Sequence, residues 1–209
     1  MVELRTRDAD RTRLEIRRAA LAEFAEKGLG GARIDSIAER AGINKKLIYY
    51  YFGSKDDLFL EALELTYADI REAEQALKLD ELEPVEAVRR LVAFTWDHYL
   101  KHPEFLTLLN TENLHQARHL ERSDRIRETN SPIIQMLENI LEKGRRQGVF
   151  RGGVDPVHLY ITIAAQSYFY LSNNATLSIV FGRDLRTPKA LAERLSHTTE
   201  VVLGYLLRG

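Results

Sequence analysis

The sequence predicts an all-α protein of about nine helices, and two observations support this fold class. Apolar residues recur at helical spacing along nearly every segment, and no stretch alternates convincingly between apolar and polar residues as a strand does. Glycines and cap-plus-proline pairs interrupt the pattern at intervals that suit helix ends and helix starts. The 209 residues are 44% apolar and 29% charged, which is ordinary for a globular protein and sufficient for a core without crosslinks.

The first part of the chain predicts four helices. The first carries apolar residues at four-residue steps, and Gly28 can end it. Asn44 is a good N-cap for the third helix, and Ser54 with Asp57 resembles a capping box at the start of a long fourth helix. The expected ranges are 12–27, 34–41, 44–52 and 54 to about 77.

The rest of the chain continues with helices. Pro84 suits a first turn, and Asp155-Pro156 and Thr187-Pro188 are two cap-plus-proline starts. Ser131-Pro132 could start or kink a further long helix. The expected helices cover 84–101, 103–120, a segment that ends between 144 and 148, and two stretches that begin at 156 and 188. The candidate loops are 78–83, 148–154 and 182–187.

Composition limits the possible classes of protein. Without cysteine, the chain has no disulfides and no thiolate metal sites. Its beginning lacks the apolar stretch of a secretory signal, and no run reaches the roughly 18 apolar residues of a membrane span. We therefore expect a cytoplasmic protein with no membrane contact.

The net charge of −1 conceals an asymmetry. Residues 1–55 contain 12 Lys/Arg and 8 Asp/Glu, a balance of +4. Subtracting these from the totals of 30 and 31 leaves 18 and 23, a balance of −5, for residues 56–209. A basic head suits contact with a polyanion, although a chance imbalance in solvated surface is an equal alternative.

Two short helices joined by a glycine turn, after a longer supporting helix, form a helix-turn-helix arrangement. The third helix has three consecutive tyrosines and two lysines, whose hydroxyl and ammonium groups can reach phosphates and base edges in a major groove. The alternative is a surface helix whose tyrosines lie on the core. The apolar residues expected to hold the three helices together are Ile37, Ala38, Ala41, Ile43, Ile48 and Phe52.

The stretch GLGGARIDSIAERAGINKKLIYYYFGSKDDLFLEAL resembles the DNA-binding signature of TetR/AcrR-type transcriptional regulators. The resemblance covers residues 11–65, about a quarter of the chain. It implies DNA contacts from Arg33, Asn44, Lys45, Lys46, Tyr49, Tyr50, Tyr51 and Lys55.

Within this set, Tyr49 and Lys55 are expected mainly on phosphates, with Lys46 and Tyr50 nearer the bases. Two positions depart from the family pattern. Arg33 stands where a Thr or Ser cap is usual, so we expect it to take a phosphate, and Lys46 stands where Gly is common. The arginines at 5, 7, 11 and 13 are either an arm that touches a groove or, our preference, a solvated tail.

The resemblance also implies a homodimer formed through the last two helices, which places two recognition helices on successive major grooves. In the first of these helices, 157–171 is apolar on almost every side, as expected for a helix buried on two faces. In the last helix the apolar stripe consists of Leu191, Leu195, Val202 and Leu206. Both stripes could instead be ordinary core.

An effector site is expected among the helices between 84 and 173, where an aromatic lining with a few polar groups suits a moderately hydrophobic organic molecule. The candidate residues are Trp96, Tyr99, Phe105, Leu109, Glu112, Asn113, His115, His119, Met136, Gln166, Tyr168, Phe169 and Asn173. The polar cluster around residues 110–119 could equally be a partly solvated helix face. The i, i+4 pairs His98/His102 and His115/His119 have the spacing of metal ligands, but we expect no metal there.

The resemblance implies a ligand-responsive bacterial transcriptional regulator, most simply a repressor, that binds a palindromic operator as a dimer and is released by its effector. DNA binding is assigned to residues 1–55, and effector binding and dimerisation to 56–209. An activator, an effector-free DNA-binding protein and an all-α enzyme are the alternatives. No GxSxG, phosphate loop or HExxH motif occurs, so we expect no enzyme, no catalytic residue and no cofactor.

Overall fold

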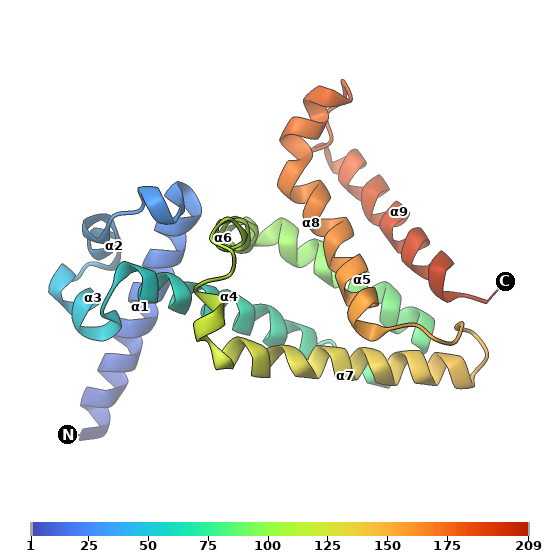
Figure 1. Cartoon of the computed structure of the whole chain (residues 1–209), viewed down its shortest axis with the longest axis horizontal. Coiled ribbons are helices and arrows are strands. Elements are labelled where there is room, and N and C mark those ends of the chain that lie inside the picture. Colours follow the sequence, from blue (N-terminus) through green and yellow to red (C-terminus); the bar gives the residue numbers. More distant parts are fainter. Residues whose placement is uncertain (1, 209) are drawn as a thin grey trace. The chain divides into compact units, whose positions relative to one another are not determined.

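The computed structural model describes residues 2–208, without the side chains of 2–8, 127 and 129–131. Arg5 and Arg7 of the predicted arm or tail therefore lie outside the described side chains. Within the described range every regular element is a helix, and the all-α prediction is confirmed (Figure 1). The α-helices are α1 (Val2–Gly31), α2 (Ile34–Ala41), α3 (Lys45–Phe52), α4 (Lys55–Gln75), α5 (Pro84–Lys101), α6 (Pro103–Leu114), α7 (Asp124–Arg146), α8 (Pro156–Val180) and α9 (Pro188–Leu206). Two short 3-10 helices cover Leu79–Glu81 and Leu120–Arg122.

The chain packs into two compact units, which we call the head unit and the body unit. The head unit consists of Met1–Asp69 and Pro103–Thr129, and the body unit of Ile70–His102 and Asn130–Gly209. The backbone passes from one unit to the other within α4, between α5 and α6, and within α7. Packing thus gives the head unit more of the chain than residues 1–55. The predicted division at residue 55 concerns the roles of the two parts, and it stays a prediction.

Most predicted helix starts are confirmed, because each depends on a local backbone contact. The Asn44 side chain accepts a hydrogen bond from the backbone N–H of Lys46 (2.9 Å), and Ser54 Oγ accepts one from Asp57 N (3.0 Å). At α8 and α9 the same role falls to Asp155 and Thr187, each followed by a proline at the first helical position.

Gly28 interrupts α1 as predicted, because its backbone angles (φ 65°, ψ 172°) are not helical, and a short helical stretch follows it to Gly31. Pro132 was predicted to start or kink a helix; it lies inside α7 and therefore does not start it. One boundary differs from prediction. The helix predicted over 103–120 ends at Leu114, because Gln116 and Ala117 take left-handed backbone angles (φ 57° and 62°) that no α-helix accommodates.

The head unit is built around a core shared by α1, α2, α3, α4 and α6. The rings of Phe24 from α1 and Phe59 from α4 meet edge to face, with centroids 5.2 Å apart. Ile37 of α2 and Ile48 of α3 are fully buried against them, and Leu108 adds a contact from α6. This core fixes how α2 and α3 lie on α1.

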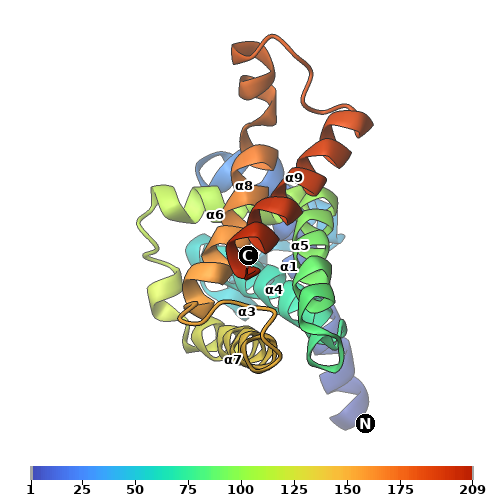
Figure 2. The same cartoon turned by 90° about the vertical axis from the view of Figure 1, so that its right-hand side faces the viewer.

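In the body unit α5, α8 and α9 pack against one another, and Figures 1 and 2 show α8 and α9 side by side. Trp96 of α5 is buried against Tyr170 of α8, with ring centroids 5.6 Å apart, and the Tyr170 hydroxyl donates to the carbonyl of Leu185 (2.8 Å). Gly144 in α7 leaves room for the fully buried ring of Phe150, which would lie 2.1 Å from a Cβ at that position. Among the described residues, no helix is both long enough and apolar enough to cross a bilayer.

Candidate DNA-binding surface and ligand site

Helix α2 begins without a side-chain cap, and a buried glutamate from α1 compensates. The backbone N–H of Arg33 donates to Glu23 Oε1 (3.4 Å), while Arg40 Nε (3.0 Å) and Lys27 Nζ (3.0 Å) also bind the Glu23 carboxylate. Burial acts to raise the pKa of Glu23, but these hydrogen bonds and the two cations outweigh it and lower that pKa below its usual value. The sequence interpretation missed this residue, and the only available signal was the absent hydroxyl at position 33.

Helix α3 separates its apolar and polar side chains cleanly. Ile48 and Phe52 are buried in the head core, whereas Tyr50 is 80% exposed and Tyr49 is 50% exposed. Tyr51 is half-buried, and the guanidinium of Arg13 lies 5.3 Å from its ring centroid. The alternative that all three tyrosines lie on the core is therefore wrong for Tyr49 and Tyr50.

The cations predicted to contact DNA differ in their exposure and in the partners that their side chains already bind. Lys46 in α3 and Arg33 at the N-cap of α2 are both exposed. Lys45 is exposed, but its ammonium lies 2.8 Å from the carboxylate of Asp35. Lys55 points inward and donates to the carbonyl oxygens of Leu29 (2.8 Å) and Ala32 (3.2 Å), which closes the end of α1.

A buried contact between a histidine and a glutamate joins α6 to the segment that follows it. His119 Nδ1 lies 2.5 Å from Glu112 Oε2, and the backbone N–H groups of His119 (2.8 Å) and Leu120 (3.0 Å) donate to Glu112 Oε1. Arg122 from the following 3-10 helix binds the Asp57 carboxylate at the start of α4. The hydrogen bonds from Ser54 and Arg122 lower the pKa of Asp57. These contacts tie the segment after α6 to α4 within the head unit.

The predicted effector residues fall into two groups. Six belong to the head unit: Phe105, Leu109, Glu112, Asn113, His115 and His119. Seven belong to the body unit: Trp96, Tyr99, Met136, Gln166, Tyr168, Phe169 and Asn173. In the head group, Glu112 and His119 are buried and bound to each other, whereas Asn113 is exposed. The effector assignments stay predictions.

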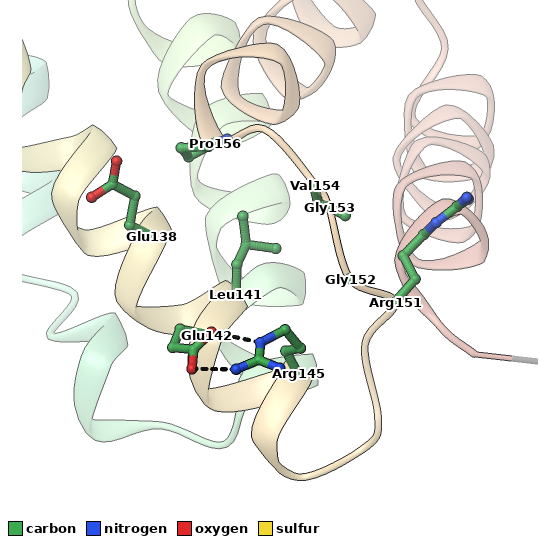
Figure 3. Close-up of a pocket in the computed structure, with 9 residues that line it drawn as sticks. All are labelled: Glu138, Leu141, Glu142, Arg145, Arg151, Gly152, Gly153, Val154 and Pro156. Atoms are coloured by element: carbon green, nitrogen blue, oxygen red, sulfur yellow. Dashed lines mark hydrogen bonds and ion pairs between the residues drawn. The ribbon is translucent and has the colours of Figure 1, made fainter.

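The described residues of the body unit line at least two hollows. The larger, about 630 Å³, is lined by Phe169, Tyr170, Leu177, Phe181, Arg183, Leu185 and Arg194. Phe169 is the one predicted effector residue in this lining. The smaller, about 170 Å³, lies between α7 and the segment before α8, and Figure 3 shows Arg145 there, bound to Glu142 by two hydrogen bonds of 2.8 Å.

The body unit also holds a buried polar cluster that the sequence interpretation missed. Arg71 and Glu74, near the end of α4, are only 4% and 1% exposed. Arg71 Nη1 lies 2.6 Å from Glu74 Oε2, and Nη2 donates to the hydroxyl of Tyr160 in α8. Burial raises the pKa of Glu74 to about 7, against the opposing influence of Arg71. In the sequence the two residues look like any i, i+3 pair on a solvated helix face.

The exposed apolar side chains of α8 form a stripe. Val157, Ile161, Ala165 and Phe169 are exposed at four-residue steps, with Ile161 at 53% and Phe169 at 58%. Leu159 and Ile163 point the other way, into the body core. The helix predicted to be apolar on almost every side is thus apolar both on the face that packs into the core and on an exposed face.

The stripe predicted on α9 needs correction. Val202 and Leu206 are buried in the core of their own body unit, so they are not free to meet a second copy. Leu191 and Leu195 are half-buried and pack inward as well. The exposed large apolar residues of α9 are Val201 and Tyr205, each of which directly precedes one of these buried residues in the sequence. Apolar residues spaced three to four positions apart occur both on helix faces in a core and on helix faces in an interface. Periodicity alone therefore did not distinguish a core face of α9 from an interface face.

The histidine pairs do not gather further ligands. The rings of His98 and His102 lie side by side with centroids 4.4 Å apart, and those of His115 and His119 are 5.7 Å apart. Across the part of the chain that the structure describes, no group of three or more His, Asp or Glu side chains could hold a metal ion.

Comparisons with known proteins match both parts of the chain. The model of bacterial regulatory proteins of the tetR family matches residues 16–62, and the model of a tetracycline repressor-like C-terminal domain matches residues 84–202. Over 205 residues the chain is 43% identical to the HTH-type transcriptional repressor NicS of Pseudomonas putida, an alignment that covers 98% of this chain and 97% of that protein. It is also 40% identical over 108 residues to the HTH-type transcriptional repressor SCO4008 of Streptomyces coelicolor, covering 52% of this chain and 53% of that protein.

Solved structures agree on the fold. The transcriptional regulator SCO4942 from Streptomyces coelicolor superimposes with a TM-score of 0.70 at 22% identity, covering 95% of this chain and 99% of that one. FadR from Bacillus subtilis, solved in complex with stearoyl-CoA, gives 0.67 at 18% identity over 92% and 98% of the two chains. The chain belongs to the TetR family. It is a transcriptional regulator and not an enzyme.

Proposed function

We propose that this regulator is a repressor that binds operator DNA as a homodimer and leaves it when a small organic effector binds. The observation that carries the proposal is the outer face of α3, where Tyr49, Tyr50 and Lys46 stand exposed on a helix whose other face is locked into the head core. The names of NicS and SCO4008 as repressors support repression over activation.

On DNA, Tyr50 and Lys46 are the best-placed groups for base edges, and Tyr49 and Arg33 for phosphates. Asn44 contributes by capping α3, which fixes the angle at which these side chains leave the helix. Lys45 and Tyr51 already have partners, Asp35 and Arg13, and would exchange or share them on binding. Lys55 would reach a phosphate only by leaving the two carbonyl oxygens that it binds.

The homodimer is proposed through the α8 stripe together with Val201 and Tyr205 of α9. A row of apolar side chains exposed at four-residue spacing is costly to leave in water, and pairing with a second copy would bury it. Dimerisation also supplies the second recognition helix, since one short helix reads only a few base pairs.

Release by an effector requires that the effector bind the DNA-free arrangement more tightly than the DNA-bound one. The complex of FadR with stearoyl-CoA shows a protein of this fold holding an organic ligand. Coupling of about 1–3 kcal/mol is the usual scale for such a link, and it must be reciprocal. Calorimetry with and without operator DNA should therefore show that DNA weakens effector binding by the factor by which effector weakens DNA binding.

DNA recognition is tested by selecting duplexes from a random library with the full-length protein and then titrating the selected operator. Tyr50→Ala and Lys46→Ala should each weaken specific binding by roughly 1–3 kcal/mol, since each removes a base-edge contact. Lys189→Ala is the matched control, because Lys189 is an exposed cation at the start of α9. The assignment of α3 would be refuted if no operator can be selected. It would also be refuted if Tyr50→Ala and Lys46→Ala bind the operator as tightly as the control Lys189→Ala.

A further inference from the structure

We propose that Arg71, with Glu74 and Tyr160, forms an anion-binding site in the body unit, and that the effector is a small organic carboxylate held by the Arg71 guanidinium. The inference rests on the proposed function, because it assigns the chemical class of the effector and the residues that recognise it.

The first argument is that the cluster is buried but incompletely bonded. Arg71 donates a hydrogen bond to the Tyr160 hydroxyl, yet its Nε and Nη1 atoms have no hydrogen-bond acceptor among the described residues. Both carboxylate oxygens of Glu74 likewise accept no hydrogen bond there. The Nη1–Oε2 distance of 2.6 Å brings the two charges together without the alignment of a hydrogen bond. Buried polar groups are nearly always paired, so this deficit needs an explanation.

The second argument is that the two unpaired Arg71 nitrogens are hydrogen-bond donors of a kind that suits carboxylates. A guanidinium presents five N–H donors in a planar fork that matches the two oxygens of a carboxylate, and it stays charged at all ordinary pH values. A ligand carboxylate would accept from Nε and could replace Glu74 at Nη1. A neutral amide or alcohol offers no charge to balance the guanidinium.

The third argument is the charge balance. Because burial raises the pKa of Glu74 to about 7, this side chain is only partly ionised at neutral pH and does not fully neutralise Arg71. A bound monoanion would neutralise the remaining positive charge of Arg71. Glu74 would then bind a proton and leave its position beside Nη1. No covalent step is involved.

The surroundings indicate what the carboxylate is attached to. The Tyr160 ring lies under the guanidinium, 5.2 Å from centroid to Cζ, and packs against the apolar core of the body unit. Tyr99 of α5 is buried and close enough to interact electrostatically with Arg71. These neighbours favour an aromatic or short aliphatic acid over a highly charged molecule.

The site predicts a distinctive pH dependence. The groups that face the cluster are the phenols of Tyr99 from α5 and Tyr160 from α8, and burial raises the pKa of Tyr160 further above its usual value. Glu74 is then the group that titrates near neutrality. Its ionised form competes with the ligand for Arg71, so the carboxylate should bind about tenfold more weakly at pH 8 than at pH 6.

The test uses the full-length protein and three matched pairs of probes: benzoate and benzamide, phenylacetate and phenylacetamide, hexanoate and hexanamide. At least one carboxylate should raise the melting temperature and weaken operator binding while its amide does neither. Arg71→Gln should lose at least tenfold in affinity for that carboxylate, and Arg90→Gln, an exposed arginine of α5, should not. Glu74→Gln should abolish the weakening between pH 6 and pH 8.

Circular dichroism checks that each variant is folded. If Arg71→Gln is not folded, Arg71→Lys takes its place, because it keeps the charge and loses the fork, and the same loss is expected. The proposal is overturned if no carboxylate exceeds its amide, if the variant at position 71 binds the carboxylate as tightly as the parent, or if the pH dependence survives Glu74→Gln. Operator binding by the untreated protein is measured separately, so a failure of the proposed function would be recognised as such.

Discussion

The backbone N–H of Arg33 donates to the side chain of Glu23, so the start of the first short helix of the helix-turn-helix is held by a carboxylate from α1. The same carboxylate binds Lys27 and Arg40 and has no exposed surface. One side chain thus joins α1 to both ends of α2. The position of α2, and of α3 after it, depends on a charge that lies inside the protein.

Glu23→Gln should lower the free energy of unfolding at neutral pH by about 2–3 kcal/mol, because it removes a buried charge that three donors were arranged to bind. Glu26→Gln is the control, since Glu26 also binds Arg40 but is exposed. The pKa of Glu23 is lowered in the folded state, so its contribution is present above the ordinary carboxylate pKa and is lost as the pH falls through the folded value. Denaturant titrations that give equal losses for both variants would contradict this role.

Lys55→Met should destabilise the protein by about 1–3 kcal/mol, because it leaves the carbonyl oxygens of Leu29 and Ala32 without their charged donor. The salt dependence of operator binding should stay as in the parent. Arg33→Ala is the comparison, because the exposed Arg33 side chain is proposed to bind a phosphate, and loss of that contact should reduce the salt slope by about 1. A reduced slope for Lys55→Met would instead mean that this ammonium moves to a phosphate on binding.

Ile161→Lys should convert the dimer into a monomer, because it places an unpaired charge in the centre of the exposed apolar stripe of α8. Sedimentation at micromolar concentration should give the 24.0 kDa monomer for this variant and twice that mass for the parent. Leu100→Lys makes the same chemical change at an exposed leucine of α5 and should remain dimeric. A monomeric parent, or a dimeric Ile161→Lys, would refute the interface.

The stability of the protein should fall as the pH rises from about 4.5 to about 7, through the contribution of Glu74. Its folded pKa of about 7 lies above the ordinary 4.5, so in this window the folded state keeps a proton that the unfolded state has lost. The shift corresponds to at most about 3 kcal/mol. Glu74→Gln should remove this part of the pH dependence, whereas the exposed Glu72→Gln should leave it. If the curves of stability against pH are parallel for the parent and Glu74→Gln, the pKa of Glu74 is not raised in the folded state.

What the sequence could predict depended on how local the cause was. The starts of α3, α8 and α9 follow from one side chain and a neighbouring backbone N–H, and Asn44, Asp155 and Thr187 act as expected. The all-α fold follows from periodicity in the same way. The early end of α6 rests on two left-handed residues, Gln116 and Ala117, neither of which is a glycine that would have marked the turn.

The candidate sites were harder to predict, because they depend on contacts between distant parts of the sequence. The exposure of Tyr50 and the inward turn of Lys55 are decided by what lies beside α3 and α1, and neither shows in the residue type. For the same reason Val202 was predicted in the dimer interface, although it lies in the core of the body unit. Arg71 and Tyr160 are 89 residues apart, so no local pattern announces their hydrogen bond.

The burial of Trp96 against Tyr170 gives the protein a built-in optical reporter. It is the chain's single tryptophan, and it belongs to the body unit. Emission excited selectively at the indole therefore follows the melting of that unit alone, while far-ultraviolet dichroism follows helix content in both. Where the two signals separate during a denaturant titration, the head and body unfold as independent cooperative units, and where they coincide the chain unfolds as one.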